Sequence, residues 1–75
     1  MYNLIEYYEE NDSVKWHLVD FADTKSEIDI KKVEIAKDLN DMGIETLEVI
    51  TSKNINSLKE ILKRDGTKIF QVVEG

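Results

Sequence analysis

Two glycines set the layout of this chain. Gly43 and Gly66 each follow a stretch in which apolar residues recur at helical spacing, and each precedes a run of strand-forming residues. Helices often end at a residue in the left-handed conformation, which glycine adopts without steric cost. The sequence therefore predicts two helices, each ended by a glycine and followed by a strand. The one other glycine is Gly75, so the chain has no glycine-rich loop of the kind that binds phosphate.

The first part of the chain is predicted to form a β-hairpin. Residues 2–8 are rich in aromatic and branched side chains, which favour strands, and the polar residues 9–13 should form the turn. Residues 14–21 should form the second strand. Its alternation puts one set of side chains on one face (Trp16 and Leu18) and a second set on the other (His17, Val19 and Phe21).

The first helix is expected over residues 25–42. Thr24 and Glu27 have the spacing of a capping box, in which the two residues bind each other's backbone N–H groups. Apolar residues then recur at helical spacing: Ile28, Val33, Ile35, Ala36, Leu39 and Met42. The alternation in residues 28–30 also suits an extended segment, so a helix start nearer Lys31 is the alternative.

The remaining elements are a strand over residues 44–51, a helix over residues 53–65 and a strand over residues 67–73. The order ββαβαβ predicts an α/β fold, a two-layer α+β sandwich with a four-stranded mixed sheet, in one domain spanning residues 1–75. Right-handed crossovers would make the second, third and fourth strands parallel. If the strands lie in sequence order, the first strand is antiparallel at the edge and both helices pack mainly on one face.

The predicted strands carry more apolar residues than two short helices can cover. Large exposed apolar patches usually mark partner surfaces, so we expect self-association, most simply a homodimer, or binding of another protein. Aromatic residues are enriched among the side chains that dominate interface energies. The candidate anchors are Tyr2, Tyr7, Tyr8 and Trp16.

The charge of the chain is −6 and is unevenly distributed. Residues 1–49 hold thirteen acids and five lysines, whereas residues 50–75 hold three acids and five bases. We expect the acidic part to bind a protein with a basic surface, although net charge for solubility is the simpler explanation. The acidic candidates are Glu9, Glu10 and Asp12 in the turn, and Asp29, Glu34, Asp38 and Asp41 in the first helix.

The basic residues of the second half are Lys53, Lys59, Lys63, Arg64 and Lys68. Direct nucleic-acid binding would need a basic stripe that neutralises phosphates, and these five are few in a chain of this net charge. They are better explained as the solvated face of a helix. We therefore expect no direct nucleic-acid binding.

Little in the sequence indicates catalysis. The chain has no cysteine, which excludes thiolate chemistry, and His17 is its one histidine, placed in a strand pattern with no partner motif. Asp20 and Asp23, with Thr51 and Ser52, are candidate Mg²⁺ ligands if the second and third strands are neighbours. We more readily assign the two aspartates to a solvated loop before the first helix. No catalytic residue, metal or cofactor is predicted.

These observations favour a small acidic protein-binding module, a regulator or inhibitor of another protein, that carries out no enzymatic reaction. A small-ligand or Mg²⁺-dependent module at the Asp20 edge is the alternative. No apolar run is long enough to span a membrane and the first residues do not resemble a signal peptide, which predicts a cytoplasmic protein. Lysine outnumbers arginine nine to one, as in AT-rich genomes, so the source is expected to be a low-GC bacterium or its phage.

Overall fold

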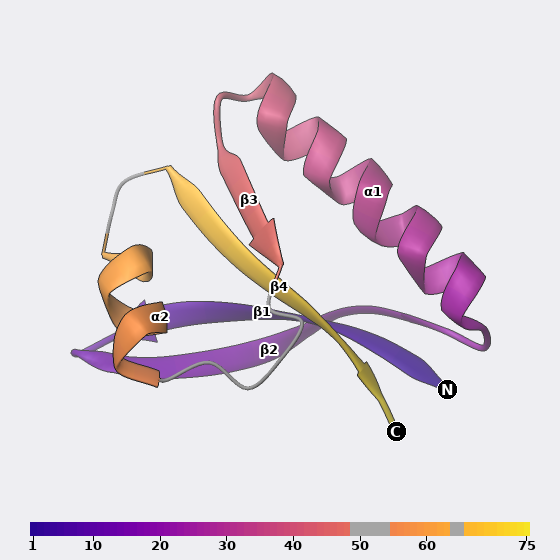
Figure 1. Cartoon of the computed structure of the whole chain (residues 1–75), viewed down its shortest axis with the longest axis horizontal. Helices are drawn as coiled ribbons and strands as arrows, with labels where there is room; N and C mark the ends of the chain where they lie inside the picture. Colours follow the sequence, from indigo (N-terminus) through magenta and orange to yellow (C-terminus); the bar gives the residue numbers. More distant parts are fainter. Residues whose placement is uncertain (49–54, 64–65) are drawn as a thin grey trace.

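The computed structural model describes residues 1–48, 55–63 and 66–75. Within these residues the chain forms a four-stranded mixed sheet with two helices, in the predicted order ββαβαβ (Figure 1). The expected α/β class is confirmed. The elements are β1 (Tyr2–Glu10), β2 (Ser13–Ala22), α1 (Lys25–Asp41), β3 (Glu45–Glu48), α2 (Ile55–Leu62) and β4 (Thr67–Glu74). The predicted ends of the third strand at residues 49–51, and of the second helix at 53–54 and 64–65, lie outside the described residues.

The turn between β1 and β2 is shorter than predicted. Asn11 and Asp12 both have positive φ angles, 52° and 65°, as in the two-residue turns that match the twist of paired strands. Asn and Asp adopt this conformation more readily than other residues that carry a side chain. Residues 9, 10 and 13 therefore extend the strands, and the hairpin ends in a tight polar tip.

Helix α1 begins and ends where the capping residues predict. Thr24 Oγ1 accepts a hydrogen bond from the backbone N–H of Glu27 at 3.2 Å, and Gly43 follows the helix with a φ of 82°. The alternative start near Lys31 is wrong. The predicted apolar face needs one correction, because Val33 and Met42 are exposed. Val33 lies about 140° around the helix from the buried Ile28, so both cannot face the sheet.

The expected strand order is wrong, although the strand directions are as predicted. The observed order is β2-β1-β4-β3, with β1 antiparallel to both neighbours and β4 parallel to β3. Strand β1 is thus inside the sheet instead of at its edge. The reason is the burial of β1. Leu4 and Ile5 point to opposite faces of this strand and are both buried, as expected for a strand inside the sheet. Strand β2, at the edge, is mostly exposed.

The two helices lie on opposite faces of the sheet, which corrects the expectation of one shared face. Leu4 and Phe70 pack with Ile28 of α1, whereas Tyr7 and Ile69 pack with Leu58 of α2. Adjacent residues of a strand point to opposite faces, so these two clusters are separated by the sheet. The chain crosses the whole sheet through α1 and returns through α2 (Figure 1). Right-handed crossovers in opposite directions put their helices on opposite faces.

A bulge in β2 changes which side chains share a face. Leu4 pairs with Asp20 but Ile5 pairs with Leu18, so Val19 is an extra residue in β2. One extra residue reverses the alternation beyond it. Phe21, paired with Asn3, therefore shares the face of Trp16 and Leu18, and its predicted place beside His17 is wrong.

Candidate binding surfaces

The face of the sheet that carries α2 is only partly covered. Helix α2 is eight residues long and packs at the end near Tyr7 and Ile69. Beyond it, four apolar side chains are between 37% and 62% exposed: Trp16, Leu18, Phe21 and Val73. We call these four residues the open sheet face. A hollow of about 330 Å³ runs between three of them and is floored by Asn3 and Ile5. Of the apolar residues in the predicted last strand, Val73 lies here, whereas Ile69 and Phe70 are buried.

The predicted aromatic anchors have different surroundings. Trp16 is exposed on the open sheet face. Tyr7 is half-buried against α2 and its hydroxyl donates a 2.6 Å hydrogen bond to Gln71. Tyr8 contacts the ring of His17, with ring centres 5.2 Å apart, and Tyr2 packs against the α1 cluster. Of these four aromatic residues, Trp16 is the one that offers most of its surface to a partner.

The acids of the hairpin tip are held by the protein itself. Asp12 lies 3.0 Å from the Nζ of Lys59 and 2.7 Å from that of Lys63, both on the α2 side of the chain. Glu9 accepts a hydrogen bond from the backbone N–H of Asp12, and Glu10 lies 3.6 Å from Lys15. Lys68 of the expected basic stripe pairs with Glu6, and Lys53 and Arg64 lie outside the described residues. The described lysines of that stripe therefore face internal acids.

The Asp12 contacts predict a pH-dependent stability. The hydrogen bonds from Lys63 and Lys59 lower the pKa of Asp12 to about 2, below its ordinary value of 3.8. A carboxyl with a lowered pKa in the folded state stabilises the fold above its unfolded pKa, and this contribution is lost as the pH falls toward 2. Asp12→Asn keeps the turn geometry but removes the charge. It should lower the melting temperature relative to wild type at pH 7, and the difference should vanish near pH 2.

Thermal melts between pH 2 and pH 7 check this prediction, with the exposed Asp23→Asn as the control for the loss of one acid. A difference between Asp12→Asn and wild type that is the same at both ends of the pH range would contradict it.

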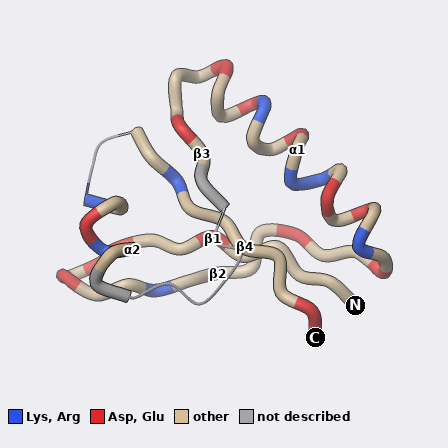
Figure 2. The backbone as a smooth tube through the Cα atoms, in the orientation of Figure 1, with Lys and Arg blue, Asp and Glu red and all other residues tan. Residues whose placement is uncertain are grey.

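The charges of α1 differ between its two ends. Near its start, Asp29 lies 3.3 Å from Lys25 and 3.8 Å from Lys32, so this acid is neutralised. Acidic residues follow along α1 toward its end (Figure 2). Three of them, Glu34, Asp38 and Asp41, are exposed. Ile30 and Val33 lie on the same outer side and are more than half exposed. We call the surface formed by these five residues, Ile30, Val33, Glu34, Asp38 and Asp41, the outer face of α1. The exposed Lys37 lies among them, so the acids of this face outnumber its bases by three to one.

Two of these acids stand where they destabilise the helix. The carboxyl end of a helix carries partial negative charge, so an acid in the last turn is unfavourable by about 0.3–1 kcal/mol. Asp38 and Asp41 both lie in the last turn of α1, which has no basic residue to compensate. Acids needed only for net charge could occupy many positions at no such cost.

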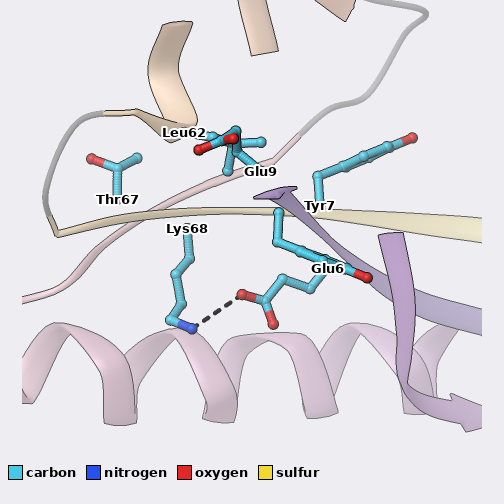
Figure 3. Close-up of a pocket in the computed structure, with 7 residues that line it drawn as sticks. Glu6, Tyr7, Glu9, Leu62, Thr67 and Lys68 are labelled. Atoms are coloured by element: carbon cyan, nitrogen blue, oxygen red, sulfur yellow. Dashed lines mark hydrogen bonds and ion pairs between the residues drawn. The ribbon is translucent and has the colours of Figure 1, made fainter. Parts of the chain in front are cut away.

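His17 lies beside a polar pocket and is hydrogen-bonded to an acid that pairs with Lys68. Strands β1 and β4 are paired only up to Tyr7 and Ile69, and beyond that point lies a pocket of about 250 Å³. The two carboxylate oxygens of Glu6 lie 3.0 Å from His17 Nε2 and 3.1 Å from Lys68 Nζ. Glu6 and Lys68 point toward α1, whereas Leu62 and Thr67 lie on the opposite side of the strand (Figure 3). The charges of Glu6 and Lys68 compensate each other. The ring of His17 contacts Tyr8 and its Nε2 is hydrogen-bonded to Glu6, and these two contacts hold no Ser, Thr or Cys.

The Asp20 edge does not have the neighbours that a Mg²⁺ site was expected to use. Strands β2 and β3 lie at opposite edges of the sheet, so the expected neighbourhood is wrong, and Thr51 and Ser52 lie outside the described residues. Asp20 accepts hydrogen bonds from the backbone N–H of Phe21 and from Lys31, and both lower its pKa. Among the described residues, no group of three or more acids and histidines could hold a metal ion.

Comparison with protein-family models, with curated proteins and with solved structures finds no match. What the protein does has therefore to be inferred from its own geometry. Neither described helix is both long and apolar enough to cross a membrane.

Proposed function

We propose that this protein is a small non-enzymatic protein-binding module, a regulator or inhibitor of another protein, whose outer face of α1 binds a basic surface. The observation that carries the proposal is the position of Asp38 and Asp41 in the last turn of α1, where they are exposed and oppose the helix dipole. Proteins keep locally destabilising features mainly where function needs them.

The neighbouring side chains support the same proposal. Ile30 and Val33 are exposed beside the acids, although apolar residues on the outer side of a helix gain nothing from the fold itself. An apolar centre with a charged rim is the usual composition of a protein interface. The rim acids would attract a basic partner and speed its association.

Affinity capture with matched variants tests the proposal. The first variant removes the three acids of the outer face: Glu34→Gln, Asp38→Asn and Asp41→Asn. The control removes three exposed acids elsewhere: Asp23→Asn, Glu60→Gln and Glu74→Gln. Both variants change the net charge by the same amount, so a difference between them reports position and not charge.

From a lysate of a low-GC bacterium, wild type and control should retain a common protein that near-molar salt releases, and the outer-face variant should lose it. The outer-face variant should also be slightly more stable than wild type, by up to about 1 kcal/mol per removed last-turn acid, so its loss of binding is not loss of fold. Urea denaturation checks this second point. Equal capture by all three proteins would contradict the proposal.

A further inference from the structure

We infer that a second copy of this chain covers the open sheet face, so that two sheets pack face to face in a twofold dimer. This inference is independent of the proposed function of α1, because it concerns the opposite side of the sheet. It rests on three observations: the distribution of charge over the two faces of the sheet, the surface area of the protein, and the thickness of the layer that α2 forms on one part of the open side.

The charges of the sheet are segregated by face. The strand register places twelve residues of β1, β2 and β4 on the α2 side, and one of them, Glu9 near the hairpin tip, is charged. The other eleven are uncharged: Asn3, Ile5, Tyr7, Val14, Trp16, Leu18, Phe21, Thr67, Ile69, Gln71 and Val73. The α1 side of the same strands carries six charged residues, with His17 beside them: Glu6, Glu10, Lys15, Asp20, Lys68 and Glu74. Two copies with a charge of −6 each repel one another, and contact through this face leaves the charges of the α1 side on the outside of the dimer. A partner of opposite charge would gain little here, whereas a second copy finds an uncharged surface.

The surface area is consistent with one missing partner. A compact monomer of 8.7 kDa is expected to expose about 4,700 Å². This protein exposes 5199 Å², roughly 500 Å² more. A specific dimer needs to bury at least about 1,000 Å² in total, or roughly 500 Å² from each copy. The excess over the whole chain is similar in size to the area that one side of a small stable interface would bury.

Helix α2 covers one end of its side of the sheet, and the layer it forms is about as thick as a second packed sheet would be. A helix is about 10–12 Å across, and two packed sheets lie about 10 Å apart. A second sheet on the open sheet face would thus continue the layer that α2 begins over Tyr7 and Ile69. In a twofold dimer the same surface serves both copies, so Trp16 of each copy would contact apolar side chains of the other.

Sedimentation equilibrium from about 1 to 500 µM tests the dimer, for which we expect a dissociation constant on the order of 10 µM. Leu18→Glu puts a charge into the open sheet face and should leave the protein monomeric throughout this range. The matched control is Met42→Glu, which adds the same charge at an exposed apolar residue after α1 that belongs to neither proposed surface. It should dimerise like wild type.

A second variant separates face-to-face packing from pairing of β2 edges. Val73→Glu lies on β4, inside the sheet, so it disrupts packing on the open sheet face but leaves the edge of β2 unchanged. It should also be monomeric. If Val73→Glu dimerises like wild type while Leu18→Glu does not, the copies associate through their edges and the face-to-face dimer is wrong.

Fluorescence of Trp16, the one tryptophan of the chain, gives an independent readout. Its emission should shift to shorter wavelength with rising concentration in wild type and Met42→Glu, because dimerisation buries the exposed ring. It should stay constant in Leu18→Glu. Far-ultraviolet circular dichroism establishes that each variant is folded. A wild-type protein that stays monomeric to 500 µM, with constant emission, would overturn the inference even if a variant failed to fold.

Discussion

Replacing Ile28 by alanine should lower the free energy of unfolding by about 2–5 kcal/mol, as deletion of a fully buried branched side chain usually does. Ile28 is fully buried and packs with Leu4, Ala22 and Phe70, so it joins α1 to three strands. Small domains have a total stability of only about 5–15 kcal/mol, and one of 75 residues has a thin margin. We therefore expect Ile28→Ala to be largely unfolded near body temperature, as measured by urea denaturation.

Val33→Ala is the matched control for this prediction. Both positions lie in α1 and both substitutions remove a branched side chain, but Val33 is 62% exposed. Because alanine favours helices more than valine does, this substitution should change stability by less than about 0.5 kcal/mol or raise it slightly. Equal losses for the two variants would show that α1 is rotated relative to the sheet in solution.

Reversing the acids of the outer face of α1 should slow association with the captured partner about 10- to 100-fold at low salt. Charges around an interface act mainly on the association rate, and steering can change that rate by one to three orders of magnitude. The variant is Glu34→Lys, Asp38→Lys and Asp41→Lys. Stopped-flow mixing with the purified partner measures the association rate. The wild-type rate should itself fall steeply as the salt concentration rises, because the Debye length decreases from about 10 Å at 0.1 M to 3 Å at 1 M.

Glu10→Lys shows whether the hairpin tip belongs to the same binding surface. The sequence predicts a role for Glu9, Glu10 and Asp12 in partner binding, and Glu10 can be reversed without disturbing the contacts of Asp12 with Lys59 and Lys63. A slower rate in this variant would extend the surface to the tip. A rate that responds neither to salt nor to the α1 reversals would reduce the acids to a solubility feature and make the open sheet face the main candidate.

The elements of this fold could be predicted from the sequence because their signals are local. Thr24 and Gly43 mark the ends of α1 through contacts within a few residues, and Gly66 precedes β4 with a φ of 80°. Strand order depends instead on pairing between distant segments, such as β1 with β4, for which no local signal exists. One cue was present: Leu4 and Ile5 are adjacent apolar residues, which indicates a strand covered on both faces.

The candidate site could be predicted only in part, for similar reasons. The surplus of apolar strand residues correctly indicated an uncovered face with Trp16 on it. The bulge at Val19 leaves no recognisable mark in the sequence, so Phe21 was expected on the wrong face. The contact of Asp12 with Lys63 joins residues 51 positions apart, and composition alone could not show that the acidic tip is neutralised by α2.

The placement of the two helices on opposite sides of the sheet has a consequence for valency. If two copies join through the open sheet face, each α1 points away from the dimer, and the particle offers two identical docking sites in opposite directions. Such a particle could crosslink two separate target molecules. It could bind both subunits of a dimeric target only if that target extends to both sides of the particle. The second contact would then form at a high effective concentration and strengthen binding by orders of magnitude.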